Sequence, residues 1–158
     1  MNNKHCIFCQ IVRGEVPAHV IWESDDHLAF LSIFPNTEGF SVVIPKQHHD
    51  SYAFEQDDQV LSALVLATKE VAHIIDGYFK DVSRTGMFFE GFGVDHLHSK
   101  LFPMHGTGNL DEWKNIESQT MDKFFTKYPG YLSSNDSKRA ADEQLAELAK
   151  NIINSYRD

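Results

Sequence analysis

The sequence predicts an α+β protein, in which five short extended segments accompany one long amphipathic helix. Stretches rich in β-branched and aromatic residues are separated by turn residues within 20–45 and again within 85–102. Between 57 and 79 the apolar residues instead recur three or four apart, which is the period of a helix that is buried on one face. Strands grouped on either side of a single helix favour an α+β fold.

Length and charge limit the kind of protein this is. With 158 residues the chain is long enough for one domain with a sizeable core. The net charge is −9 at pH 7, and there is no run of Lys or Arg, so we expect no binding to nucleic acid or to an anionic membrane. The first residues, 1–5, lack the apolar stretch of a signal peptide, and no window approaches the length of a membrane span. We therefore expect a cytoplasmic protein.

The N-terminal half predicts a short helix and three strands. Val, Ile, Trp and Phe on both sides of Asp25-Asp26 indicate a hairpin. The breaker residues at 35–39 come before a third strand, which ends in Lys46-Gln47-His48-His49. The predicted elements are a helical turn at 6–13 closed by Gly14, strands at 20–24 and 27–31, and a strand at 40–45.

The central helix begins near Asp57 or Asp58, either of which can cap it, and Gly77 lies near its end. Two further strands are predicted at 85–90 and 94–102. Only Gly91-Phe92-Gly93 lies between them, which predicts a tight antiparallel connection.

The last third of the chain predicts an extension of the first domain. After Gly106 aromatic residues are spread through polar sequence, and a helix at about 138–156 carries apolar residues on one face. This stretch is too short for a separate domain and too apolar for a disordered tail. We expect a domain at 1–106 and, at 107–158, a C-terminal extension that packs on the core or on a partner subunit.

The stretch from Val94 to His105 carries the candidate chemistry. In an extended strand His96, His98, Lys100 and Phe102 lie on one face, while Leu97, Ser99 and Leu101 lie on the other and pack. Two imidazoles and an ammonium on one face suit an anion such as phosphate. Pro103 is predicted to end the strand, because it has no amide hydrogen.

A metal site is the alternative for these histidines, and both sites can be present together. A catalytic metal on His96 and His98 needs further ligands, and Asp95 points to the opposite face. The two cysteines, Cys6 and Cys9, are separated by two residues and are candidates for half of a Cys₂His₂ zinc site, with His48, His49 and His96 as candidate partners. Inert reduced thiols and a redox pair are the other interpretations of this spacing.

A phosphate site makes His98 the candidate nucleophile. A neutral imidazole attacks phosphorus and passes through a phosphohistidine, provided that its other nitrogen is held by a hydrogen bond. His98 lies between His96 and Lys100, which can both donate to phosphate oxygens.

Four segments in this order and spacing resemble the histidine triad (HIT) family of nucleotide hydrolases and transferases. They are residues 6–17, Ala29-Phe30-Leu31, residues 42–48, and Val94-x-His-x-His98. The resemblance covers about residues 5–106. It implies a five-stranded antiparallel sheet, a homodimer, and attack on a nucleotide α-phosphate by His98.

The resemblance also implies a ligand set and a nucleoside pocket. The positions that bind structural zinc in bacterial-type members hold Cys6, Cys9, His48 and His96. The nucleotide-binding positions hold Phe30, Ser32, Ile33, Phe40 and Gly93.

The sequence departs from the family pattern at several of these positions. Lys100 stands where the family has the third His, and Ser32 stands where it has a ribose-binding Asp. Phe92 and Gly93 replace the Gln and the Ser or Thr that usually precede the motif. Lys100 supplies positive charge but exchanges protons near pH 7 only if its pKa is strongly lowered. His105 is a candidate for the missing acid, and a surface histidine is the other interpretation.

The sequence thus predicts a nucleoside phosphoramidase or nucleotide hydrolase that acts through His98. The alternative is a catalytically weak nucleotide-binding or regulatory module, which the Lys100 and Ser32 departures favour.

Overall fold

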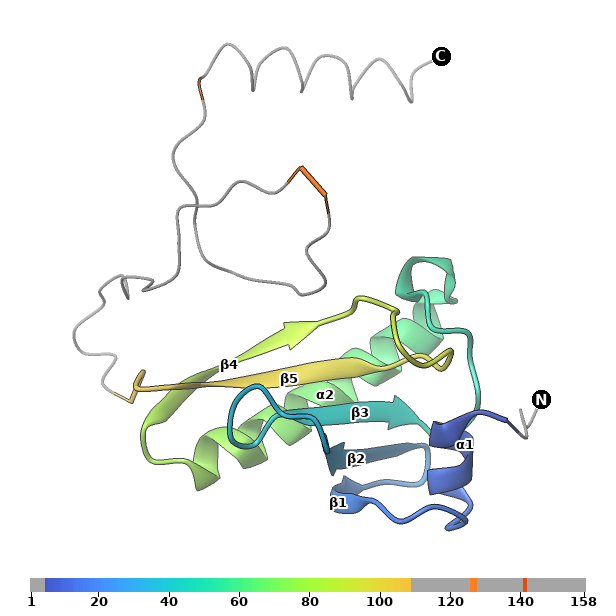
Figure 1. Ribbon diagram of the computed structural model, residues 1–158, viewed down its shortest axis with the longest axis horizontal. Coiled ribbons are helices and arrows are strands. Elements are labelled where there is room, and N and C mark those ends of the chain that lie inside the picture. Colours follow the sequence, from blue (N-terminus) through green and yellow to red (C-terminus); the bar gives the residue numbers. More distant parts are fainter. Residues whose placement is uncertain (1–4, 109–125, 128–140, 142–158) are drawn as a thin grey trace. The chain divides into compact units, whose positions relative to one another are not determined.

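The computed structural model describes residues 5–108, 126–127 and 141. The strands of residues 5–108 form one antiparallel sheet in the order β1-β2-β3-β5-β4, and α2 crosses one face of it (Figure 1). Its elements are α1 (Ile7–Val12), β1 (His19–Glu23), β2 (His27–Leu31), β3 (Ser41–Pro45), the 3₁₀ helix η1 (Ala53–Glu55), α2 (Asp58–Tyr78), β4 (Val82–Phe88) and β5 (Ser99–His105). The predicted α+β class and its five strands are confirmed.

The two faces of the sheet bury different sets of side chains. On one face Ala29 and Val43 pack with α2, whose buried residues follow the helical period that the sequence predicts: Leu64, Ala67, Val71 and Ile75. On the other face Leu28, Phe30, Val42 and Ile44 form a second cluster that α1 partly covers. This alternation along each strand gives the sheet an apolar cluster on each of its two faces.

The start of α2 differs from expectation in one detail. Asp57 is the N-cap residue, but its carboxylate makes no capping hydrogen bond. The helix is instead fixed to the sheet at Thr68, whose hydroxyl donates to the Leu64 carbonyl oxygen at 2.7 Å and lies 2.6 Å from the Ser99 hydroxyl. Packing and this buried contact hold α2 on the sheet.

The predicted start of the fifth strand is wrong. β5 begins at Ser99 rather than Val94, and β4 ends at Phe88, so residues 89–98 connect them instead of three turn residues. The connection bonds to the segment that follows β3: Leu97 N–H donates to the His49 carbonyl oxygen at 2.8 Å, and Ser51 N–H donates to Asp95 at 3.0 Å. These contacts replace the expected pairing with β4.

The predicted end of the strand at Pro103 is also wrong, because β5 continues to His105. Pairing with β3 stops at Leu101, and beyond that residue β5 pairs with β4 alone. A proline is tolerated where one side of a strand has no partner strand, since no ladder hydrogen bond is lost there.

The predicted extension at 107–158, with its helix at about 138–156, lies outside the described residues apart from 107–108, 126–127 and 141. Within the described part of the chain, no helix is both long and apolar enough to cross a membrane.

Candidate metal centre and phosphate site

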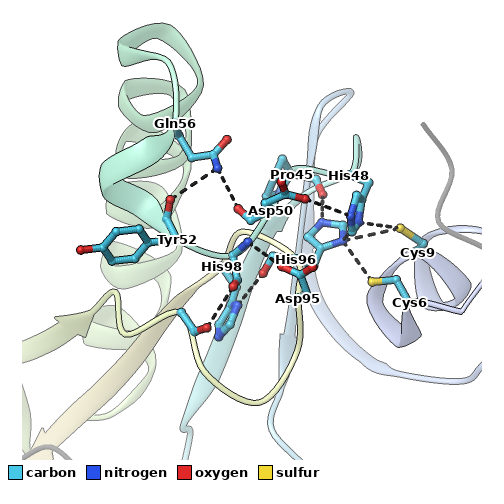
Figure 2. Close-up of polar contacts among 12 residues, drawn as sticks. Cys6, Cys9, Pro45, His48, Asp50, Tyr52, Gln56, Asp95, His96 and His98 are labelled. Carbon is cyan, nitrogen blue, oxygen red and sulfur yellow. Dashed lines mark hydrogen bonds and ion pairs between the residues drawn. The ribbon is translucent and has the colours of Figure 1, made fainter.

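Four predicted metal ligands meet between α1 and the end of β3. Cys6 precedes α1 and Cys9 lies within it, and both point toward His48 and His96 (Figure 2). The candidate ligand atoms of these four residues all lie within 4.8 Å of one another, and both cysteines are buried and form no disulfide. His49, the other candidate, supplies only its backbone carbonyl to Leu97.

The separations between these atoms fit a tetrahedral zinc ion. Each cysteine Sγ has a histidine Nδ1 at 3.4 Å, and the two Nδ1 atoms are 3.3 Å apart. Zinc bonds of about 2.3 Å to sulfur and about 2.0 Å to nitrogen predict sulfur–nitrogen separations of about 3.6 Å and a nitrogen–nitrogen separation of about 3.3 Å. The four residues therefore fit a structural zinc ion.

His96 is held in the tautomer that binds a metal. Its Nε2–H donates to the Pro45 carbonyl oxygen at 2.8 Å, so Nδ1 carries the lone pair and faces the two thiols. Burial, more than the nearby His48, lowers the pKa of His96 to about 4. A neutral imidazole with a fixed orientation is the form that a metal requires.

His98 is oriented as the phosphate hypothesis requires. Its Nδ1–H donates to the carbonyl oxygen of His96 at 2.7 Å, which leaves the lone pair on Nε2. Burial lowers its pKa, so the imidazole is neutral near pH 7. The ring is only 3% exposed, and the Phe8 ring packs edge-on against it with centroids 5.6 Å apart. Phe8 therefore packs directly against the candidate nucleophile.

Lys100 is paired in this structure. Its ammonium contacts the Glu90 carboxylate, and both side chains are largely shielded from solvent. Burial lowers the pKa of Lys100. Sequence reasoning missed Glu90, because a single glutamate after a strand gives no signal of where its carboxylate lies.

The predicted nucleotide-binding residues are distributed over four places. Phe30 is buried against Phe8, with centroids 5.4 Å apart, and so connects to His98. Ser32, whose hydroxyl accepts a hydrogen bond from Phe34 N–H at 3.1 Å, lies with the exposed Ile33 in the segment after β2. The others are Phe40, which packs edge-on against Phe102, and Gly93, which has a positive φ of 91° in the 89–98 connection.

His105 is not brought together with His98. It lies at the other end of β5, about 20 Å along the strand. Both of its ring nitrogens contact oxygens of other residues, Asp81 and the Glu38 carbonyl.

Comparison with known proteins identifies the family. The HIT domain matches residues 13–107. An uncharacterised HIT-like protein from Methanocaldococcus jannaschii is 32% identical over 130 residues, which cover 79% of this chain and 99% of that protein. An adenosine 5'-monophosphoramidase from Schizosaccharomyces pombe is 34% identical over 98 residues, which cover 62% of this chain and 73% of that enzyme. The chain therefore belongs to the HIT family.

A solved structure shares the fold. The zinc-bound histidine triad family protein from Mycobacterium smegmatis superimposes with a TM-score of 0.58 at 24% identity, and the match covers 73% of this chain and 84% of that one. The predicted family and the HIT-like fold are confirmed.

Proposed function

We propose that this protein is a nucleoside phosphoramidase or nucleotide hydrolase that uses His98 as its nucleophile. The observation that carries the proposal is the hydrogen bond from His98 Nδ1–H to the His96 carbonyl oxygen, which directs the lone pair to Nε2. The sequence similarity to an adenosine 5'-monophosphoramidase supports a nucleotide substrate.

In the proposed reaction, Nε2 of His98 attacks the α-phosphorus of a nucleotide. A phosphorus–nitrogen bond to the imidazole forms as the bond to the leaving amine or phosphate breaks, and the leaving group takes a proton. Water then attacks the same phosphorus, the phosphorus–nitrogen bond to His98 breaks, and the nucleoside monophosphate leaves. The proton that the water loses returns to the group that protonated the leaving group. The His96 carbonyl oxygen stabilises the positive charge that develops on the ring during the first step.

Lys100 is the proposed partner of the phosphate oxygens. It follows His98 by two residues, just inside the start of β5, and an ammonium in a shielded site binds phosphate strongly. The lowering of its pKa by burial makes Lys100 a stronger acid than a free lysine. It is therefore also our candidate donor of the leaving-group proton, in place of a third histidine.

The nucleoside end of the substrate is proposed to lie along Phe30, Ser32, Ile33 and Phe40. Ser32 offers one hydroxyl for a ribose contact, where a carboxylate would accept two hydrogen bonds. We infer weaker ribose selectivity than a carboxylate would give.

The metal centre is proposed to hold structural zinc on Cys6, Cys9, His48 and His96. When bound, zinc would supply a rigid link between α1 and the sheet, and it takes no part in the phosphate chemistry. Reduced thiols are the state that such a site needs, which agrees with the predicted cytoplasmic location.

A homodimer is proposed as the assembled form. In addition to the family resemblance, exposed apolar side chains lie on α2 and on the edge strand β4: Val65, Leu66, Ile74, Tyr78 and Met87. Exposed apolar groups that gather on one part of a surface are typical of an interface.

A catalytically weak nucleotide-binding module is the second candidate, and two observations favour it. Lys100 is already paired with Glu90, and His98 is only 3% exposed. A phosphate must then displace a carboxylate before it reaches the ammonium.

The replacement His98→Asn tests the proposal. Asparagine keeps a polar group of similar size but has no nucleophilic nitrogen, so we expect turnover of an adenosine phosphoramidate to fall by at least about a thousandfold. Binding of AMP, measured by calorimetry, should change by less than about threefold, because the nucleophile acts on the reaction path. The exposed His73 on α2 provides a matched control, His73→Asn, which should leave both values unchanged.

Wild-type turnover in His98→Asn for every substrate that the parent cleaves would contradict the histidine mechanism. A wild-type protein that binds AMP but cleaves none of an adenosine phosphoramidate, a dinucleoside polyphosphate and a nucleotidyl sugar would establish the binding module instead.

A further inference from the structure

His105 joins three parts of the chain at the far end of β5. Its Nδ1 lies 3.2 Å from each carboxylate oxygen of Asp81, and its Nε2 lies 3.0 Å from the carbonyl oxygen of Glu38. The ring also packs edge-on against Phe79, with centroids 4.8 Å apart. One imidazole thereby connects β5, the turn between α2 and β4, and the segment at 32–40 between β2 and β3.

The 32–40 segment is closely fitted at its end near His105. Gly39 has a φ of +79°, and the Phe79 ring lies 2.5 Å from where a Cβ would stand. The Gly39 carbonyl oxygen accepts a hydrogen bond from the Ser41 hydroxyl at 2.7 Å. At the other end Ile33 and Phe34 are 71% and 86% exposed. The contacts around His105 therefore hold the otherwise exposed segment to the sheet.

Both nitrogens of His105 face acceptors, so both hydrogen bonds form only when the ring carries two protons. The Glu38 carbonyl and then Asp81 raise the pKa of His105, while the hydrogen bond from His105 lowers the pKa of Asp81. Asp81 is held in turn by Gly106 N–H at 3.2 Å. The charged groups that face the ring are Asp81 and Glu38, whereas the ammonium of Lys80 donates to the Gly77 carbonyl oxygen.

We propose that His105 is a positioning residue for nucleoside recognition, because its bridge from Asp81 to the Glu38 carbonyl fixes the segment that carries Ser32, Ile33 and Phe40. This role rests on the proposed function, which places a nucleoside against that segment. It differs from the catalytic acid that the sequence suggested, since His105 is remote from His98.

The bridge has a definite dependence on pH. A histidine whose pKa is raised in the folded state contributes fully below its ordinary pKa of about 6.5, and this contribution is lost as the pH rises through the raised value. The lowered pKa of Asp81 acts in the opposite sense, so that its contribution is lost in acid. The segment is therefore held most firmly at about pH 5–6.5, above the ordinary pKa of Asp81 and up to that of His105. It is held less firmly in alkali, where the neutral ring keeps only one of its two hydrogen bonds.

The variant His105→Phe separates the bridge from the packing, because phenylalanine keeps a ring against Phe79 and loses both hydrogen bonds. At pH 6 we expect amide hydrogen exchange within 32–40 to be at least about fivefold faster than in the wild type. We expect AMP binding about three- to tenfold weaker, and KM raised by a similar factor with kcat within about twofold. The same replacement at the exposed His73, His73→Phe, is the control and should change none of these values.

The dependence of KM on pH distinguishes a positioning role of His105 from a purely structural one. Wild-type KM should rise as the pH increases above 6 and His105 loses its proton, and this rise should be absent in both His105→Phe and Asp81→Asn. Unchanged exchange in 32–40, or an unchanged AMP affinity when the exchange is faster, would overturn the proposal. A wild type that binds no nucleotide would contradict the proposed function, and the exchange rates, which need no ligand, then decide by themselves whether His105 fixes the segment.

Discussion

At the scale of single residues, one hydrogen bond to each imidazole decides which of its two ring nitrogens carries the lone pair. The carbonyl oxygens of Pro45 and His96 each fix one imidazole, so that His96 presents Nδ1 to the thiols and the lone pair of His98 lies on Nε2. The same kind of contact limits Lys100, because Glu90 already occupies its ammonium. Under the proposed function we therefore expect Glu90 to affect phosphate affinity without taking part in the reaction.

We predict that Glu90→Gln tightens AMP binding by about three- to tenfold, since phosphate no longer has to displace a carboxylate from Lys100.

Lys100→Ala should weaken AMP binding by about 1–3 kcal/mol, the range of a charge-assisted hydrogen bond. Calorimetry at fixed salt measures both. Glu55→Gln, at an exposed position of η1, is the control. Weaker binding in Glu90→Gln would show that Glu90 orients Lys100 for the ligand.

At the scale of elements, α1 is a helix of six residues, too short to be stable alone. Apolar contacts of Phe8, Ile11 and Val12 hold it to the sheet, and its cysteines lie against His48, after β3, and His96, in the 89–98 connection. The connection that carries His96 and His98 thus contacts α1 and the segment after β3 rather than pairing with β4.

Metal analysis of the purified protein is predicted to find about one zinc ion per chain. Because zinc binding is coupled to folding, Cys6→Ser should lower the zinc content and the free energy of unfolding together. In the control Ser62→Ala, which changes an exposed residue of α2, both should stay at wild-type values. Metal-free protein with an unchanged unfolding curve would refute a structural zinc site.

At the scale of the whole molecule, the described residues leave apolar side chains on α2 and β4 exposed. A partner subunit and the C-terminal extension are the two candidates that we propose to shield them. The molecular mass of the full chain in solution distinguishes a partner subunit from the extension.

We predict that the full chain is a dimer in sedimentation experiments and that Leu66→Glu with Ile74→Glu converts it to a monomer, because charges would be buried at the interface. The control is Val20→Glu, at an exposed residue of the edge strand β1. Removal of residues 109–158 should cause aggregation or loss of activity. A truncated chain that stays dimeric and fully active would show that the extension is dispensable.

Local sequence determined most of the elements of this protein. Helical periodicity predicted α2, the hairpin residues predicted β1 and β2, and the two-residue spacing of Cys6 and Cys9 predicted half of a metal site. These features depend on neighbouring residues and on backbone preference, so a single sequence carries them.

Only the tertiary structure decided the rest, because it depends on contacts between residues that are distant in the chain. The 89–98 connection bonds to residues 49 and 51 instead of continuing the ladder, which shortened β5 at its start. Pro103 lies within the strand because β5 has no β3 partner there. The Glu90 contact to Lys100 and the His105 bridge to Asp81 and Glu38 join side chains to groups that no local pattern selects. The sequence thus indicated which residues carry the chemistry, and the fold decided which atoms they present.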